Sequence, residues 1–290
     1  MTRLGVFVLW LAHFLPFRIL AGTGNLLGLL LHLFANERRA VAKTNLRLCF
    51  PEMSATARDD LVRRNFMAFG RSFLERSILW WSGSARIQGL IKVEGLEHFN
   101  AVQGKPFIIL LPHFVALDVA GSWLSLHVNG VSIYSNQKNA YLNQLLIQKR
   151  IRFGRQRIYS RQQGLRPIVK AMREGFPLLY LPDQDFASRD AMFVPFFGVP
   201  ASTLTSVSRL AQLTGARVLP CIPRVLPDAQ GYEIRFFPAW ENYPTDNPQA
   251  DARQVNEFIE QRVLEMPEQY FWLHKRFKTR PEGEEKLYDL

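Results

Sequence analysis

The chain has 290 residues, 48% of them hydrophobic, and its 36 Lys and Arg against 25 Asp and Glu give a formal net charge of +11. This length buries a substantial core without metal or disulfide support, and the sequence has no low-complexity tract or internal repeat, which excludes a disordered or repeat protein. The two cysteines, Cys49 and Cys221, form neither a disulfide framework nor a zinc pattern and fit a reducing compartment. The positive charge suits nucleic acid, an anionic membrane surface or an acidic protein partner.

The N-terminus favours the membrane among these partners. Before Asn36 the only charged side chains are Arg3 and Arg18, and the run from Ile19 to Ala35 has 17 residues without a charge. That length is near the lower limit for crossing a bilayer core of roughly 30 Å. A nucleic-acid binder is disfavoured, because the apolar N-terminus argues against it and no nucleic-acid-binding motif accompanies the charge.

This apolar segment is expected to be retained, because it leads directly into charged residues and lacks a cleavage site of the signal-peptide type. The basic residues that follow it favour a cytoplasmic location for the rest of the chain and attract anionic lipid. We therefore expect a membrane-anchoring segment over residues 1–36 and a single folded domain over 37–290. The alternative is a buried core helix, or a helical hairpin broken at Pro16.

The remaining elements alternate between helices and short apolar strands. A long amphipathic helix is expected from Ser54, a plausible N-cap, to about Trp81. Strands are expected at 106–112, 131–135, 177–182, 216–222 and 232–237, and helices near 116–128, 140–152, 163–174, 204–214 and 250–266. Continuously apolar strands separated by helices predict an α/β fold with a mixed, largely parallel central sheet flanked by helices.

The stretch LLPHFVALDVAG places His113 five residues before Asp118. The spacing alone means little, since His32 and Glu37 repeat it. His113 follows a predicted strand, however, and Asp118 lies in the first turn of the next helix, at the sheet edge where sites collect. If His113 belongs to the loop, Asp118 can hold one ring nitrogen while the other acts as a general base. Since no nucleophile motif is present, direct attack by a substrate hydroxyl is favoured; metal binding is a weaker alternative.

The HFVALD stretch resembles the H-x4-D/E motif of the glycerolipid acyltransferase superfamily, and later blocks narrow the resemblance to the bacterial lipid A biosynthesis acyltransferases. These blocks are RIRFGRQRIYSR (150–161), LYLPDQDF (179–186), MFVPFFGVPASTLTSVSRLA (192–211) and YFWLHKRFKTRPEGE (270–284). With the apolar N-terminus, the resemblance covers almost the whole chain.

The resemblance implies an inner-membrane enzyme whose catalytic domain, 37–290, lies on the cytoplasmic face. It implies transfer of a fatty acyl group from acyl carrier protein, an acidic partner, to a hydroxyl of a lipid A precursor of the Kdo-lipid IVA type. His113 would be the base and Asp118 its orienting partner. No cofactor or metal is implied beyond the acyl carrier protein thioester as co-substrate.

The resemblance also suggests substrate-binding arginines. Arg150 matches the arginine of the family's second block, and a guanidinium suits phosphate or carboxylate recognition. The alternative for Arg150 is a solvated basic helix face shared with Lys149, Arg152 and Arg155. Arg161 is the second candidate.

Two further blocks carry candidate residues for substrate binding. Asp183 and Asp185 follow a predicted strand and are candidates for acceptor positioning or for orienting basic groups; the alternative is a Pro-Asp turn. Phe196, Phe197 and Gly198 either line an acyl-chain tunnel or provide core packing and a turn. No role for the tail from Trp272 to Glu284 follows from the sequence.

Asp118 departs from the lauroyl-type pattern, in which Glu is frequent, and this leaves the subfamily, the acyl chain length and the acceptor position open. Two alternatives remain at this point. The first is the same chemistry on another membrane lipid, such as a glycerolipid, an ornithine lipid or a polyene lipid. The second is a catalytically inactive membrane-bound scaffold.

Overall fold

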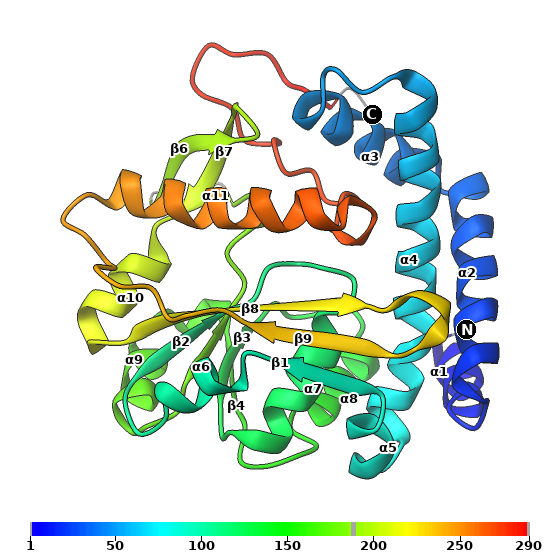
Figure 1. Cartoon of the computed structure of the whole chain (residues 1–290), viewed down its shortest axis with the longest axis horizontal. Helices are drawn as coiled ribbons and strands as arrows, with labels where there is room; N and C mark the ends of the chain where they lie inside the picture. Colours follow the sequence, from blue (N-terminus) through cyan, green and yellow to red (C-terminus); the bar gives the residue numbers. More distant parts are fainter. Residues whose placement is uncertain (1, 187–189, 289–290) are drawn as a thin grey trace.

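The chain from Thr2 to Gln88 is built of helices and the short loops that join them. The computed structural model describes residues 2–186 and 190–288. Its first helices are α1 (Thr2–Ala12), α2 (Phe17–Phe34), α3 (Asn36–Cys49), α4 (Ala55–Trp81) and the short α5 (Ser84–Gln88). Pro16 is the N-cap of α2, and the Ser54 hydroxyl accepts the Ala57 N–H at 3.2 Å to cap α4. Both helix starts agree with the sequence, and Figure 1 shows α1 and α2 along the outer side of α4.

A seven-stranded sheet forms the centre of the molecule, and the predicted α/β fold is confirmed. Its strand order is β1-β9-β8-β2-β5-β3-β4, parallel at every pairing except β8 with β9. The strands are β1 (Ile91–Glu94), β2 (Phe107–Leu110), β3 (Val131–Tyr134), β4 (Arg157–Ser160), β5 (Leu178–Tyr180), β8 (Arg217–Val225) and β9 (Tyr232–Phe236).

Five further helices lie close to where the sequence placed them, and α6 (Leu96–Ala101) is an addition. The five are α7 (Leu117–His127), α8 (Ala140–Arg150), α9 (Arg166–Arg173), α10 (Ser206–Thr214) and α11 (Pro248–Glu265), with 3-10 turns at Arg161–Gln163, Pro227–Ala229 and Pro267–Gln269. A separate antiparallel hairpin joins β6 (Ala191–Phe196) to β7 (Val199–Leu204). The short strands β1 and β4 and this hairpin are additions to the sequence-based assignment.

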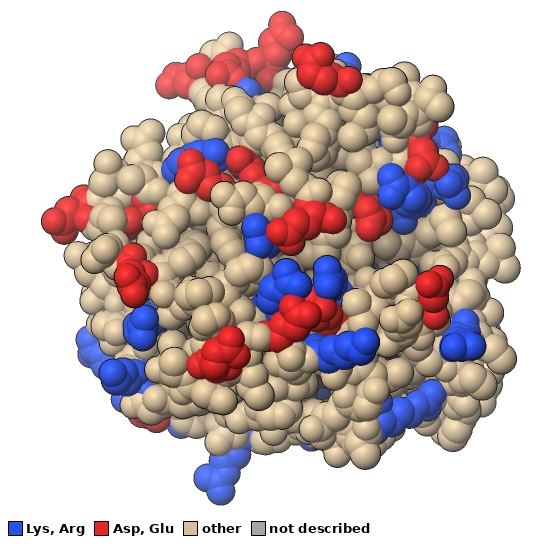
Figure 2. Space-filling model, viewed as in Figure 1, with Lys and Arg blue, Asp and Glu red and all other residues tan. Residues whose placement is uncertain are grey.

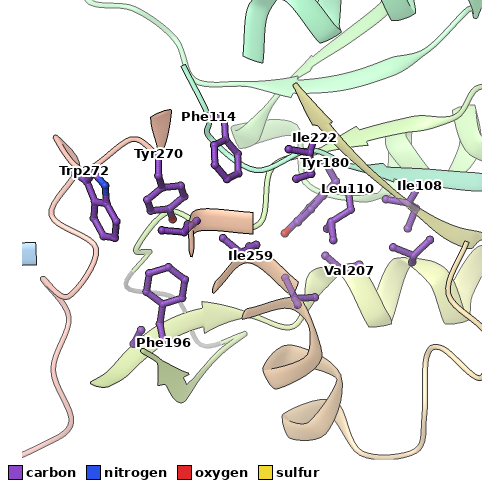
Figure 3. Close-up of a cluster of buried hydrophobic side chains, with 14 of the residues drawn as sticks. Ile108, Leu110, Phe114, Tyr180, Phe196, Val207, Ile222, Ile259, Tyr270 and Trp272 are labelled. Carbon is purple, nitrogen blue, oxygen red and sulfur yellow. The ribbon is translucent and has the colours of Figure 1, made fainter. Parts of the chain in front are cut away.

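Both faces of the sheet are buried, as an all-apolar central strand requires. In β2, Ile108 and Leu110 point into one core, with α9, α10 and α11, whereas Phe107 and Ile109 point into the other, with α6 and α7. Figure 3 shows part of the first core, where Phe114, Tyr270 and Phe196 join the side chains of the sheet. The loops at the carboxyl ends of β2 and β5 are therefore held by packed layers.

Candidate active site

His113 and Asp183 occupy equivalent positions after two neighbouring parallel strands. Leu110 at the end of β2 pairs in register with Tyr180 at the end of β5. From these paired residues the chain runs Leu-Leu-Pro-His on one strand and Tyr-Leu-Pro-Asp on the other. Since parallel strands end at the same sheet edge, the third residue after each strand end meets its counterpart.

The Asp183 carboxylate binds His113 through both of its oxygens. The distance from His113 Nδ1 to Asp183 Oδ1 is 2.7 Å, and the His113 backbone N–H donates to Oδ2 at 2.9 Å. Burial raises the pKa of Asp183, but the charge of His113, these two hydrogen bonds and the Arg276 guanidinium outweigh it and hold that pKa below its ordinary value. Asp183 is therefore an anion that accepts a proton-bearing Nδ1, which leaves Nε2 as the basic nitrogen.

Nε2 of His113 faces Gln184, whose Nε2 lies 3.1 Å away. In this tautomer the Gln184 amide donates to the ring nitrogen. An incoming hydroxyl that displaces the amide would meet the same lone pair. The imidazole is 18% exposed while the Asp183 side chain is 2% exposed, so the ring reaches the surface of the site and its partner does not.

Asp118 does not take the place expected for it. Its Oδ2 accepts from Arg76 of α4, at 2.7 Å from Nε and 2.5 Å from Nη2, and the hydrogen bonds of the described residues include none from Asp118 to the imidazole. Burial would raise the pKa of Asp118, but the charges of Arg76 and Arg150 outweigh burial and lower it. The expected contact with His113 is thus corrected: Asp183 holds the ring, and Asp118 forms an ion pair with Arg76.

The backbone of His113 and Val115 is clamped by the segment from Gln269 to Phe271, which leads into the C-terminal tail. The Phe271 N–H donates to the His113 carbonyl at 3.0 Å, and the Val115 N–H donates to the Gln269 carbonyl at 2.8 Å. The Phe271 ring stacks on the imidazole at 6.3 Å between centroids. This segment, which directly precedes the tail from Trp272 to Glu284, therefore fixes both the loop and the ring of His113.

Two buried asparagines hold the tail in turn. The Asn65 side chain on α4 donates to the carbonyls of Glu268 and Tyr270, at 2.8 and 2.6 Å. The Asn45 side chain on α3 donates to the carbonyls of Trp272 and His274, at 2.7 and 2.8 Å. Figure 1 shows the tail returning beside α3 and α4.

Asp185 anchors the loop after β5 to this tail and does not line the cavities beside His113. Its carboxylate accepts from the N–H and hydroxyl of Thr279, at 2.9 and 2.7 Å. Its backbone N–H donates to Nε2 of His274 at 3.0 Å. Burial lowers the pKa of His274 to about 4, so that this ring is neutral and able to accept.

A cavity of about 260 Å³ opens beside His113, and both candidate arginines line it. Arg150 stands at the end of α8 and Arg161 in the 3-10 turn after β4, and Gln184 and His113 line the same cavity. The Arg161 guanidinium stacks on Phe186 at 4.0 Å. The structure therefore brings His113, Arg150 and Arg161 to one cavity, where the guanidinium groups can bind a phosphate or carboxylate.

A second cavity of about 130 Å³ lies against α7 and adjoins the first. The two share Ile133, Arg150, Leu179 and Leu181. The second is lined mainly by apolar side chains, among them Trp80, Leu111, Leu117 and Phe153. The charged cavity beside His113 therefore adjoins a cavity with a larger apolar share in its wall.

The residues expected in an acyl tunnel lie elsewhere. Phe196 is fully buried at the end of β6, where it packs against Tyr270 and Phe277, as Figure 3 shows for Tyr270. Phe197 and Gly198, with φ of 50° and 77°, form the hairpin turn. None of the three lines either cavity beside His113, so the alternative of core packing plus a turn describes them.

Sequence reasoning missed several residues of the site: Arg76, Gln184, Phe271 and the asparagines of α3 and α4. The pairing of His113 with Asp183 had a signal in the sequence, because both follow a Leu-Pro pair at the end of a predicted apolar strand. No such signal marked Arg76 and Asn65, since each binds a partner more than 40 residues away in the chain.

Comparison with known proteins identifies the family of this chain. Residues 1–279 match the family model described as bacterial lipid A biosynthesis acyltransferase. The lipid A biosynthesis lauroyltransferase of Escherichia coli K12 is 35% identical over 99% of this chain and 94% of its own length. The palmitoleoyltransferase of the same organism is 33% identical with the same coverage, and its myristoyltransferase is 31% identical over 88% of this chain and 79% of its own length. The chain therefore belongs to the bacterial lipid A biosynthesis acyltransferases and is an acyltransferase of that pathway.

Proposed function

We propose that the enzyme transfers a fatty acyl chain from the thioester of acyl carrier protein to a hydroxyl of a lipid A precursor of the Kdo-lipid IVA type. The observation that carries the mechanism is the orientation of His113. Its Nδ1 is bound by the buried Asp183 carboxylate, and its Nε2 is directed at Gln184 in the wall of the larger cavity. This is the geometry of a general base with a fixed tautomer.

In the proposed step the acceptor hydroxyl displaces the Gln184 amide and gives its proton to Nε2. The oxygen attacks the thioester carbonyl, the carbon–sulfur bond breaks, and the carrier thiolate takes the proton back from the imidazolium. Asp183 stabilises the imidazolium between these two transfers. Direct attack is supported by the burial of both cysteines, which keeps their thiols away from substrate.

We assign the arginines and Asp118 to substrate binding and positioning. Arg150 and Arg161 face the cavity that contains His113 and would bind anionic groups of donor or acceptor. Asp118, between Arg76 and Arg150, would set the position of both guanidinium groups. Asp185 would act by anchoring the loop that carries Asp183.

The apolar cavity against α7 is the proposed site of the acyl chain. Arg150 lines both this cavity and the one that contains His113, and apolar side chains such as Trp80 and Phe153 make up much of its wall. Burial of methylene groups there would contribute about 0.8 kcal/mol each. The names of the relatives differ in the chain transferred, so the chain selected by this enzyme would depend on the depth of this cavity.

We further place the enzyme on the cytoplasmic face of the inner membrane. The apolar α2 and the basic residues that follow it support this orientation. The net charge of +11 would attract both an acidic carrier protein and anionic lipid.

The test is an in vitro assay that offers a panel of acyl carrier protein thioesters to lipid A precursors of defined acylation, with products located by tandem mass spectrometry. The purified enzyme should acylate one hydroxyl, and His113→Ala should lower the rate by about 10²- to 10⁴-fold. Survival of transfer within about tenfold in His113→Ala would overturn the general-base mechanism. Deletion of the gene should remove one acyl chain from lipid A; an unchanged lipid A would instead overturn the acceptor assignment.

A further inference from the structure

The N-terminal helices are built into the catalytic domain through close packing of α2 on α4. Gly24 and Gly28 on α2 face Gly70 on α4. A Cβ built on Gly28 would lie 2.2 Å from the Phe66 carbonyl oxygen, and one built on Gly70 would lie 2.3 Å from the Gly28 backbone nitrogen. The two backbones therefore touch where larger side chains would not fit.

Both ends of α2 are also tied to the same folded body. Arg86 of α5 donates to the carbonyls of His13 and Leu15, the latter at 2.7 Å, just before α2 begins. Just after α2, Arg38 of α3 donates to the Leu273 carbonyl of the C-terminal tail at 3.1 Å. A helix fixed at both ends to one domain keeps both ends on that domain's side of a bilayer.

The beginning of α1 contacts the catalytic domain as well. The Asn139 side chain, at the start of α8, donates to the Thr2 hydroxyl at 3.4 Å, and Arg3 stacks over Tyr141 at 5.7 Å. Leu9 in the middle of α1 is buried. The chain from Thr2 to Phe34 thus lies against the domain along its length.

The opposite side of the two helices is exposed and apolar, and we call it the outer face. Only 22% of α2 is buried, whereas a core helix would be mostly buried. Thr23, on the exposed side, satisfies its hydroxyl on the carbonyls of Ile19 and Leu20. In Figure 2 the outermost margin on the side of α2 is uncharged. The large exposed side chains of the outer face are Leu4, Phe7, Val8, Trp10, Leu11, Phe14, Leu15, Ile19, Leu26, Leu30, Leu33 and Phe34.

We propose that the outer face docks α1 and α2 into one leaflet of an anionic bilayer, without crossing it, so that the N-terminus and the catalytic domain lie on the same side. The occupant is lipid because the face is long, continuous and apolar, while the exposed Arg3 and Arg18 at its margins match anionic headgroups. The helix α2 is roughly 27 Å long at 1.5 Å per residue, so length alone would permit crossing.

Packing argues against crossing. If α2 crossed together with α4, the bilayer would have to accommodate the charged side chains of α4, including Asp60, Arg63 and Arg64. If α2 crossed alone, it would uncover the buried ion pair of Arg71 and Glu75 beneath it. Either route costs more than burying the outer face in a single leaflet.

The test uses single cysteines and a membrane-impermeant maleimide, since the native Cys49 and Cys221 are buried and should remain unlabelled. Thr2→Cys reports the N-terminus, and Asp246→Cys, in an exposed loop, reports the catalytic domain. In spheroplasts and inverted inner-membrane vesicles, both cysteines should label in the same preparation. If Thr2→Cys and Asp246→Cys label in opposite preparations, the proposal is overturned. If Thr2→Cys is protected wherever Asp246→Cys is protected, and both label after detergent is added, the proposal is supported.

A matched glycine pair tests the packing separately. Gly28→Leu forces α2 away from α4, whereas the Cβ of Gly22→Leu meets no atom within 4 Å and adds apolar surface to the outer face. We expect Gly28→Leu to lower the melting temperature of the purified protein and Gly22→Leu to keep it. Equal melting of both variants with the wild type would show that α2 is independent of the domain and would overturn the proposal. The topology does not depend on which hydroxyl is acylated, so the labelling and the transfer assay can fail independently.

Discussion

Asp183 holds His113 by two hydrogen bonds at once, from Nδ1 at 2.7 Å and from the backbone N–H at 2.9 Å. One carboxylate therefore sets both the tautomer of the ring and the course of the loop that carries it. Asp118, five residues after His113, is engaged with Arg76. The two aspartates are expected to affect catalysis through different partners.

A masking experiment separates these roles. Asp183→Asn should lower kcat by about 10²- to 10⁴-fold, because an amide cannot accept from both Nδ1 and the backbone N–H. In a His113→Ala background, Asp183→Asn should lower kcat no further, since effects of residues that act as a unit are not additive. Asp118→Asn should lower kcat in that background by the same factor as in the wild type, because Asp118 acts through Arg76. Sensitive detection of transferred acyl chain by mass spectrometry measures each rate.

The contrary pattern is equally clear. If Asp118→Asn became silent in the His113→Ala background while Asp183→Asn did not, Asp118 would be the partner of the imidazole during catalysis. The Arg76→Gln variant is the control for the ion pair. In an Arg76→Gln background, Asp118→Asn should lower kcat much less than it does in the wild type.

Acyl chain length should respond to Gly121. This residue lies on α7 one turn after Asp118, lines the apolar cavity, and has no atom within 4 Å of a Cβ built on it. Gly121→Leu would shorten the cavity without straining the helix, because Leu is the better helix former. In competition among acyl carrier protein thioesters, the preferred chain should become shorter.

Phe153→Ala is the counterpart, since Phe153 lines the same cavity. Its truncation should shift the preference to longer chains. If neither variant changed the preferred chain while total activity was retained, the acyl group would bind elsewhere.

The sequence predicted which strands carry the site but not which side chains contact each other there. Apolar runs closed by Pro predicted strands at 106–112 and 177–182, which in the structure end at Leu110 and Tyr180. The rule that sites collect at carboxyl ends of parallel strands then pointed to His113 and Asp183. The choice between Asp118 and Asp183 needed strand order, because β2 and β5 are neighbours in the sheet but far apart in the chain. Local spacing favoured the nearer carboxylate.

The hairpin β6–β7 was missed for a different reason. Pro195 and Pro200 interrupt a strand pattern, yet in the structure they pair with each other across the hairpin. From the sequence, Phe196 and Phe197 fit a tunnel lining and core packing equally well. The contact of Phe196 with Tyr270 in the structure shows that Phe196 belongs to the core.

The clamp on His113 should depend on Asn65. Asn65→Ala removes both donors to the Glu268 and Tyr270 carbonyls and leaves buried acceptors unpaired, at a cost of about 1–3 kcal/mol. We expect a lower melting temperature in detergent together with a lower kcat. The exposed Asn100 on α6 provides the control, since Asn100→Ala should stay within about 0.5 kcal/mol of the wild type. Equal stability of Asn65→Ala and Asn100→Ala would show that the Asn65 hydrogen bonds do not stabilise the fold.

Stability should fall on acidification because of His274. Its pKa is about 4 in the folded protein against 6.5 unfolded, so between these values the unfolded chain binds more protons and stability decreases as pH falls from 6.5, levelling off below about 4. The loss should be about 2 kcal/mol at pH 5 and about 3 kcal/mol in full, at roughly 1.4 kcal/mol per pKa unit. His274→Gln keeps an acceptor for the Asp185 N–H but does not titrate. Urea unfolding in detergent at pH 7 and pH 5 should therefore show a smaller difference for His274→Gln than for the wild type, whereas equal differences would mean that His274 is not buried as a neutral acceptor.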